Sequence, residues 1–315
     1  MRIGINPWLD MVFKQLFGSE ENKALLFSLV NAVLEQAGEK LVVELELLNP
    51  YNAKKSRKDK LSIVDIKAKN EAGEWFLIEV QVEMYGYFLK RLLYYWSRHY
   101  HSQLKESEQY DELKKVTVIC FAVENLPIQT SGYCNFFRVM EARNHVLFAD
   151  DLAIHTIELP KFLLSAPQIG NALERWTYFL KHGENLDDEK LPKTLETPEM
   201  TEAVKQLKKF SLDDHQREEY EVRLKATRDY RSSIAAEFKK GKQEGRQEGI
   251  RQGKLEAIEM ALEIKFGAEG LGCLEQIQKI TDVDRLSQVQ QLVKQVQTVR
   301  ELQQKLINKV NKSEK

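Results

Sequence analysis

The spacing of apolar residues changes several times along the first half of the chain, and each change predicts a different kind of element. Apolar residues three and four apart predict two helices, over residues 10–18 and 22–34. Partial alternation of apolar and polar residues then predicts a strand over 41–48. Two alternating stretches follow, 61–67 and 75–82, and the polar, glycine-containing segment between them is typical of a hairpin turn.

After the hairpin the period becomes helical, and then strand-like again. The elements expected here are a helix over 87–105, strands over 116–123, 135–141 and 152–158, and a helix over 169–181. The stretch 116–123 is short, apolar and rich in β-branched residues, which is typical of a buried central strand. An order of helix, three strands, helix, three strands, helix describes an α/β fold with a mixed sheet flanked by helices.

The polar segment 182–193 ends this pattern, and we place a domain boundary between residues 185 and 186. The region 186–315 is almost entirely helical in composition. One helix is expected to run through 211–266, interrupted only by glycines, and the spacing over 271–307 predicts a small helical hairpin. The sequence therefore predicts a sheet-containing domain over 1–185 with a long all-α C-terminal extension.

Four glycines recur at every fourth position of this long helix: Gly241, Gly245, Gly249 and Gly253. Each glycine costs a helix roughly 1 kcal/mol relative to alanine, so the segment needs a compensating contact. A spacing of four places the glycines on one side of the helix, as a groove that a second helix can approach closely. We interpret this groove as the contact of a homo-dimer or larger oligomer, with a flexible tether as the alternative.

Composition narrows the classes of protein that fit this pattern. Hydrophobic residues make up 43% of the 315 residues and charged residues 30%, which is ordinary for a globular protein. The three cysteines have no metal-ligand spacing, and no apolar stretch resembles a signal peptide or a membrane span. We therefore expect reduced thiols, a cytoplasmic protein and no membrane partner.

The formal net charge of -1 gives no general attraction for nucleic acid, so any affinity for DNA must come from local clusters of cations. One such cluster lies directly before the hairpin and includes Lys54, Lys55, Arg57 and Lys58. Arg98 adds a cation to the polar side of the helix expected over 87–105. Runs of this kind are usually solvated, so DNA contact is one of two interpretations.

The hairpin carries the residues with the strongest indication of chemistry. Side chains two apart on a strand point to the same face, so Glu79 and Gln81 lie together, and Asp65 can face them from the partner strand. Two carboxylates this close repel each other, and a divalent cation with oxygen ligands, Mg²⁺ or Mn²⁺, relieves that repulsion. Solvated hairpins also carry such residues, but here the polar residues interrupt strongly apolar strands, where unpaired charge is costly.

Three segments occur in a fixed order: Asp10-x-x-Phe13-Lys14-x-Leu16-Phe17-Gly18, Lys60-Leu-Ser-Ile-Val-Asp65-Ile-Lys-Ala and Ile78-Glu79-Val80-Gln81. Together with the Gly-x-x-x-Gly tail, they resemble the Rpn family, the recombination-promoting nucleases or putative transposases of the PD-(D/E)XK superfamily. The resemblance runs from about residue 6 through the tail. It implies an αβββαβ nuclease core that binds DNA.

The resemblance also implies roles for individual residues. Asp65 and Glu79 correspond to Mg²⁺ ligands, and the backbone carbonyl of Val80 is a candidate third ligand. The superfamily commonly has lysine where this chain has Gln81, although the Rpn-like pattern itself commonly has Glu-x-Gln. Glutamine can position water by hydrogen bonding but carries no charge. Lys67 and Lys14 are the candidates to replace the missing cation.

Two hypotheses about function follow. The first is an Mg²⁺-dependent DNA endonuclease that hydrolyses phosphodiester bonds in recombination or mobile-element biology. The alternative is a non-catalytic DNA-binding or scaffolding protein that keeps the nuclease fold. The two differ in one observable, because only the first predicts metal-dependent cleavage, whereas both predict salt-sensitive DNA binding.

Overall fold

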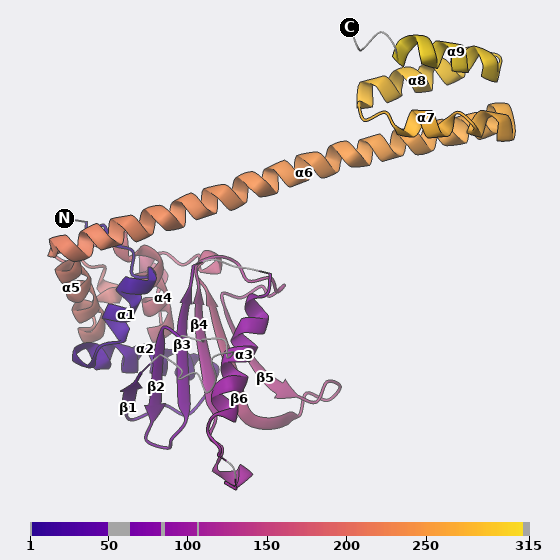
Figure 1. The fold of residues 1–315 in the computed structure, drawn as a ribbon. Coiled ribbons are helices and arrows are strands. Elements are labelled where there is room, and N and C mark those ends of the chain that lie inside the picture. Colours follow the sequence, from indigo (N-terminus) through magenta and orange to yellow (C-terminus); the bar gives the residue numbers. More distant parts are fainter. Residues whose placement is uncertain (1, 50–63, 83–85, 106, 311–315) are drawn as a thin grey trace. The chain divides into compact units, whose positions relative to one another are not determined.

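The computed structural model describes residues 2–49, 64–82, 86–105 and 107–310, the last four of these by backbone only (Figure 1). The chain forms two compact units, Met1–Leu224 and Lys225–Lys315, which we call the N-terminal unit and the C-terminal unit. The candidate chemistry lies entirely in the N-terminal unit.

The N-terminal unit alternates helices and strands in the order that the sequence predicts. Its main elements are α1 (Asp10–Phe17), α2 (Lys23–Ala37), β1 (Leu45–Leu48), β2 (Ile66–Asn70), β3 (Trp75–Gln81), α3 (Phe88–His101), β4 (Val116–Ala122), β5 (Cys134–Met140), β6 (Leu147–Glu158), α4 (Ala172–His182), α5 (Pro198–Leu212) and the start of α6 (Asp214–Leu271). The elements from α2 to β4 form the expected αβββαβ core, and α1 precedes it.

The described strands form one six-stranded mixed sheet in the order β1-β2-β3-β4-β6-β5. β1, β2 and β3 are antiparallel neighbours, β4 runs parallel to both β3 and β6, and β5 is antiparallel to β6. Every residue of β4 is buried, as expected for a central strand between two parallel neighbours. The mixed-sheet α/β fold predicted from the sequence is confirmed.

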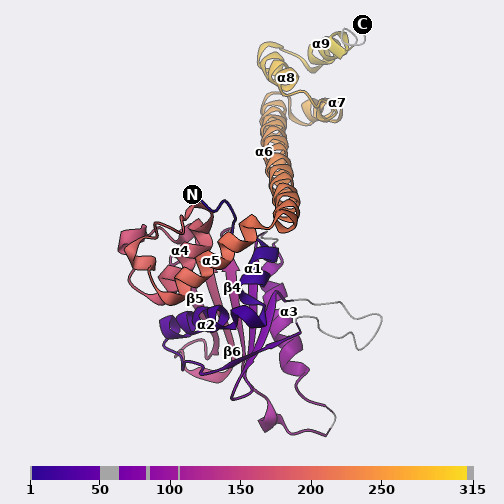
Figure 2. The same cartoon turned by 90° about the vertical axis from the view of Figure 1, so that its left-hand side faces the viewer.

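Helices cover both faces of this sheet (Figure 2). The strand side chains alternate between two apolar layers, one on each face. On β3, Phe76, Ile78 and Val80 belong to the layer formed with α1, α2, α4 and α5. Leu77 belongs to the opposite layer, together with Phe88 of α3. Since alternation places Glu79 and Gln81 on the side of Leu77, α3 is the helix that covers them.

The helical spacing over 87–105 also predicts an apolar stripe of Leu89, Leu92, Leu93, Trp96 and Tyr100, and helix α3 differs from it in detail. The described side chains that are fully buried are Phe88, Leu92 and His99, whereas Leu93 is 51% exposed. His99 is buried because its Nδ1 lies 2.9 Å from the Tyr95 carbonyl oxygen, and burial lowers its pKa to about 4. A neutral histidine therefore takes an apolar position that the residue type alone did not suggest.

The compact N-terminal unit extends beyond the expected boundary at residues 185 and 186, to Leu224. Helix α5 lies inside this unit because Met200, Val204 and Leu207 pack into the core with α1 and α2. The first turns of α6 are fixed by Tyr220, whose buried hydroxyl accepts hydrogen bonds from the backbone and side-chain nitrogens of Asn6 at 3.0 and 3.1 Å. The polar segment 182–193 is thus a connection within one core.

The C-terminal unit is helical, as expected, but contains three short helices after α6 in place of a two-helix hairpin. α7 (Leu274–Gln278), α8 (Val283–Gln295) and α9 (Val299–Val310) share an apolar core with the end of α6. α6 is helical through Gly241, Gly245, Gly249 and Gly253, and its kink lies later, at Gly267, where φ is 58°. Within the described ranges, we find no helix with the length and apolar character that a membrane span requires.

The aromatic contact between α1, α2 and α4 offers a test of this core. Trp176 is 1% exposed, its ring packs edge-on against Phe17 at 5.3 Å, and its indole nitrogen donates to Ser28 Oγ at 3.2 Å. Trp176→Ala should lower the free energy of unfolding by about 3–5 kcal/mol, because it leaves a cavity and an unpaired hydroxyl. Denaturant titration measures this loss. Phe148→Ala, at a side chain that is 81% exposed, should change it by less than about 0.5 kcal/mol.

Candidate active site

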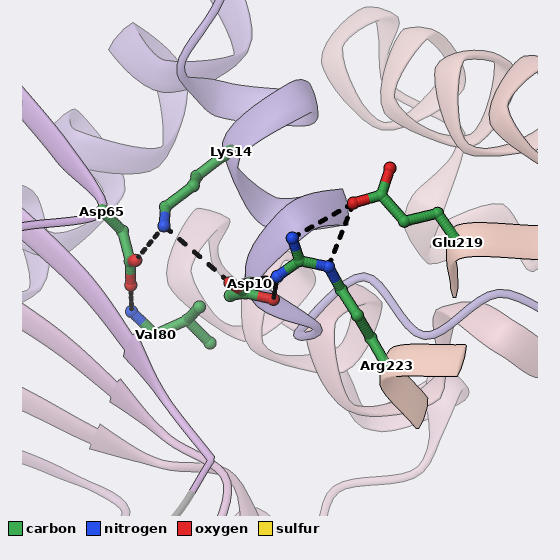
Figure 3. A network of polar contacts seen from close by, with 6 residues as sticks. All are labelled: Asp10, Lys14, Asp65, Val80, Glu219 and Arg223. Atoms are coloured by element: carbon green, nitrogen blue, oxygen red, sulfur yellow. Dashed lines mark hydrogen bonds and ion pairs between the residues drawn. The ribbon is translucent and has the colours of Figure 1, made fainter. Parts of the chain in front are cut away.

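Asp65 lies at the bend immediately before β2 and is held by two elements. Its Oδ1 forms an ion pair with Lys14 Nζ of α1 at 3.0 Å (Figure 3). Its Oδ2 accepts a hydrogen bond from the backbone N–H of Val80 on β3 at 2.8 Å. Since Ile66 pairs with Ile78 in the antiparallel register, Asp65 comes opposite Glu79, as the hairpin pattern predicts.

Glu79 is almost completely buried, with 5% of its surface exposed. Its carboxylate accepts a hydrogen bond from the Asp65 backbone N–H, while the Asp65 carboxylate accepts one from the backbone N–H of Val80, the residue after Glu79. The second oxygen, Oε1, is buried and has no hydrogen-bond partner among the described residues. An unpaired carboxylate oxygen in an apolar layer is costly and indicates a position that a further ligand can satisfy.

A second buried glutamate shows what a purely structural carboxylate looks like in this protein. Glu158, at the end of β6, is fully buried. It accepts hydrogen bonds from Leu126 N at 2.9 Å and Thr130 Oγ1 at 3.3 Å, and it pairs with Lys161 Nζ at 2.8 Å. Both of its oxygens are therefore satisfied, in contrast to Glu79.

Burial and mutual repulsion make the Asp65 and Glu79 pair unfavourable as two bare charges. Burial raises the pKa of Glu79 well above its ordinary value, and the neighbouring charge of Asp65 raises it further, against smaller opposing effects of Arg91 and Lys14. Burial also raises the pKa of Asp65, although Lys14 and the Val80 N–H oppose this. The site thus favours a positively charged ligand.

Lys14 is one of the two cations proposed from the sequence, and the structure brings it to the site. Burial works against its ammonium, but the charge of Asp65 and the hydrogen bond to it raise the pKa of Lys14 above its ordinary value. Asp10 links the helix of Lys14 to α6. Its Oδ2 lies 3.9 Å from Lys14 Nζ and 3.2 Å from Arg223 Nη1 of α6 (Figure 3). Arg223 in turn pairs with Glu219 at 3.1 Å.

Lys67, the other candidate cation, occupies a different place. Its ammonium lies 4.7 Å from the centre of the Trp75 ring, further along the hairpin, and burial lowers its pKa. This is a cation-π contact, in which the lysine rests on an aromatic face. The structure therefore places Lys14 beside Asp65 and Lys67 on Trp75.

Gln81 lies on the same face of β3 as Glu79 and is buried. Its side-chain oxygen accepts a hydrogen bond from Arg91 Nη2 of α3. No sequence motif indicates Arg91 as a site residue. The sequence pattern that could have indicated Arg91 is its spacing of three from Phe88. This spacing places it near the buried side of the helix that covers the hairpin.

The donor set fits a divalent cation with few protein ligands. Asp65 and Glu79 supply carboxylates, and the Val80 carbonyl points toward Asp65 because the N–H and C=O of one strand residue share a side. Within the described residues, no group of three or more His, Cys, Asp or Glu side chains is placed to hold a metal ion. Such a set suits a divalent cation that keeps several of its waters.

Comparison with known proteins supplies the family. A family model described as PD-(D/E)XK nuclease family transposase matches residues 7–237, well over half of the chain. The chain belongs to this family. Comparisons with curated proteins and with solved structures gave no match.

Membership of the PD-(D/E)XK nuclease family transposases confirms the resemblance and corrects its extent. The match includes α1, the hairpin with Asp65 and Glu79, and α5, but it ends at residue 237. The glycines from Gly241 onward lie outside it. The tail is therefore not part of what identifies the family.

The candidate DNA-binding residues remain predictions. Lys54, Lys55, Arg57 and Lys58 lie outside the residues that the structure describes. Arg98 is partly exposed on α3, seven residues after Arg91 and so near the same side of the helix.

The raised pKa of Glu79 has a consequence for stability. The folded protein holds this proton more tightly than the unfolded chain does, so the metal-free protein should lose stability as pH rises above the ordinary value of 4.5. The glutamine in Glu79→Gln cannot ionise, so this variant should not lose stability through the ionisation of residue 79. It should be more stable than the wild-type protein at pH 7, without metal, by about 1–3 kcal/mol. Thermal unfolding in EDTA at several pH values measures both effects.

The exposed Glu35 on α2 provides a matched control, because Glu35→Gln changes the same functional group in solvent. It should leave the pH profile of stability unchanged. Equal profiles for the wild-type protein and Glu79→Gln would contradict an unpaired charge at Glu79.

Proposed function

We propose that this protein is a metal-dependent DNA endonuclease that hydrolyses phosphodiester bonds. The observation that carries the proposal is the pairing of buried Glu79 with partly buried Asp65, with one carboxylate oxygen of Glu79 lacking a partner, on the hairpin of a nuclease-family fold. A buried carboxylate oxygen without a partner has a cost in stability, and a ligand-binding role for Glu79 accounts for that cost.

Asp65, Glu79 and the Val80 carbonyl would hold the cation, which we propose to be Mg²⁺, with Mn²⁺ as an alternative. A bound divalent cation acidifies a coordinated water and neutralises charge on a phosphate. Lys14 fixes one oxygen of Asp65, and the Val80 N–H fixes the other, so the orientation of this carboxylate is set before any ligand arrives. Gln81 lies beside Glu79, where its amide can hydrogen-bond to a phosphate or a water.

The alternative function is a DNA-binding or scaffolding protein that keeps the nuclease fold without catalysis. Gln81 favours this alternative because it brings no charge to the place where the superfamily commonly has lysine. The near-neutral net charge also favours it. Either function is compatible with a role in recombination or mobile-element biology, and cleavage distinguishes them.

The test is nicking of supercoiled plasmid DNA by the full-length protein with Mg²⁺ or Mn²⁺, compared with EDTA. Asp65→Ala and Glu79→Ala should each lower the rate at least about 100-fold, because each removes a charged ligand of the cation. Glu35→Ala, at an exposed glutamate of α2, should cut at the wild-type rate. Gel electrophoresis of the nicked and linear products gives the rates.

Two results would decide against the nuclease. Cutting by Asp65→Ala at the wild-type rate would show that the activity comes from elsewhere, such as a contaminant. DNA binding that weakens with salt, without cleavage in either metal, would support the non-catalytic alternative.

We also propose that the chain forms a homo-dimer or larger oligomer through α6. Gly241, Gly245, Gly249 and Gly253 are exposed and helical, and a Cβ added at any of them would meet no described atom within 4 Å beyond its chain neighbours and the adjacent helix backbone. The groove is thus open along this helix. Two copies of the site in one assembly would allow both DNA strands to be cut.

Gly249→Leu should dissociate such an assembly, because a large side chain prevents close approach of a second helix. Light scattering coupled to size-exclusion chromatography measures the mass. Gln243→Leu introduces the same side chain outside the glycine positions and should leave the mass unchanged. An equal mass for the wild-type protein and Gly249→Leu would remove the groove as the contact.

A further inference from the structure

A cation that no sequence motif indicated lies beside Gln81. Arg91 is in the first turn of α3, and its Nη2 donates to the side-chain oxygen of Gln81 on β3. The contact joins the helix that covers this face of the sheet to the last residue of β3. Arginine can only donate, so its presence fixes the Gln81 amide with the oxygen toward the helix.

The guanidinium of Arg91 is held in place by aromatic rings. Its central carbon lies 4.9 Å from the centre of the Phe88 ring and 5.7 Å from that of the Tyr95 ring. Its Nε is buried and has no hydrogen-bond partner in the part of the chain that the structure describes. A partly buried charge in such a place needs an anion nearby. Glu79 is close enough for the charge of Arg91 to act on its carboxyl.

The other nearby cations are committed to different contacts. Lys14 pairs with Asp65 at 3.0 Å, and Lys67 lies over Trp75. Arg91, in contrast, contacts Gln81 directly. Its charge therefore lies next to the residue that occupies the usual lysine position.

We propose that Arg91 is a positioning residue for DNA cleavage that replaces the lysine absent at Gln81. Gln81 supplies a hydrogen-bonding group at the end of β3, and Arg91 supplies the positive charge and fixes the amide from α3. The two side chains together present to a DNA phosphate what one lysine would present alone. This inference depends on the nuclease function proposed above.

The experiment uses four full-length variants in the nicking assay: R91Q, R91K, Q81K and the double variant Q81K/R91Q. R91Q should lower kcat at least about 100-fold, the size of effect seen when one preorganised donor is lost. R91K keeps the charge without the planar fork and should retain more activity than R91Q. R143Q, at an exposed arginine in the turn between β5 and β6, should have wild-type activity.

The decisive comparison is the sign of the Q81K effect. In the wild-type background Q81K places an ammonium against the guanidinium of Arg91, and activity should fall. In the R91Q background the same change restores the missing charge, and activity should rise at least about tenfold. A residue that only supports the fold cannot produce this reversal, so Q81K effects of equal sign in both backgrounds would overturn the proposal.

A second measurement does not depend on cleavage. Titration calorimetry without DNA should show that R91Q binds Mn²⁺ at least as tightly as the wild-type protein, because a like charge near the carboxylates has been removed. Asp65→Ala should lose this binding. Loss of Mn²⁺ binding in R91Q would show that Arg91 only supports the two carboxylates, and would overturn the proposal.

Failure of the nuclease function can be told apart from failure of this inference. If the wild-type protein does not cut DNA, the nuclease is rejected, and binding of a labelled duplex in Ca²⁺ then tests Arg91. R91Q should bind about three- to tenfold more weakly, and Q81K/R91Q should recover the affinity. Equal affinities reject Arg91 as a source of charge for DNA. If R91Q does not fold, Q81K alone tests the inference. A Q81K variant at least as active as the wild-type protein would then overturn it.

Discussion

The burial of two carboxylates on neighbouring strands is the constraint on which the rest of the N-terminal unit depends. Asp65 and Glu79 cannot lie this close without compensation, and three elements supply it. Helix α1 brings Lys14 to Asp65, β3 donates the Val80 N–H, and α3 brings Arg91 near Glu79. Helix α1 is positioned in turn by packing of its phenylalanines against the core and by the pairing of Asp10 with Arg223. The helices thus serve to hold charge at the hairpin as well as to cover the sheet.

Three buried glutamates in this unit show how the same side chain acquires different roles. Glu39 pairs with Lys115 at 2.7 Å and Arg138 at 2.9 Å, and these partners with His155 hold its pKa well below the usual range despite burial. Glu158 has a donor for each oxygen. Glu39 Oε1 has no hydrogen bond but is paired with Arg138, whereas Glu79 Oε1 has neither a hydrogen bond nor an ion pair among the described residues, and burial raises the pKa of Glu79. Burial does not distinguish a site from a structural ion pair, but the number of donors does.

The sequence was informative where a local pattern determines the outcome. Alternation and turn composition gave the hairpin, the opposition of Asp65 and Glu79 and the buried strand β4, because strand period and turn chemistry are local. The end of the N-terminal unit was not predictable in this way. Helix α5 joins the core through contacts with α1 and α2, which lie more than 160 residues earlier, and a polar connection gave no sign of them. The apolar stripe predicted for α3 was wrong in part for the same reason, since the buried position of His99 depends on a backbone carbonyl and on Trp75.

The position of the positive charge beside Gln81 also depends on how one element packs against another. A sequence motif describes only the order of residues along one strand, so a neutral Gln81 in place of lysine indicates a missing positive charge. In space, the end of β3 is reached equally well from α3, and a guanidinium there contacts the Gln81 amide. Moving the charge from strand to helix makes it depend on how α3 packs on the sheet, through Phe88 and Leu92. A lysine on β3 would be placed by the strand itself, whereas Arg91 is placed by the core. Substitutions in that apolar layer are therefore expected to affect the chemistry of the hairpin as well as the stability of the fold.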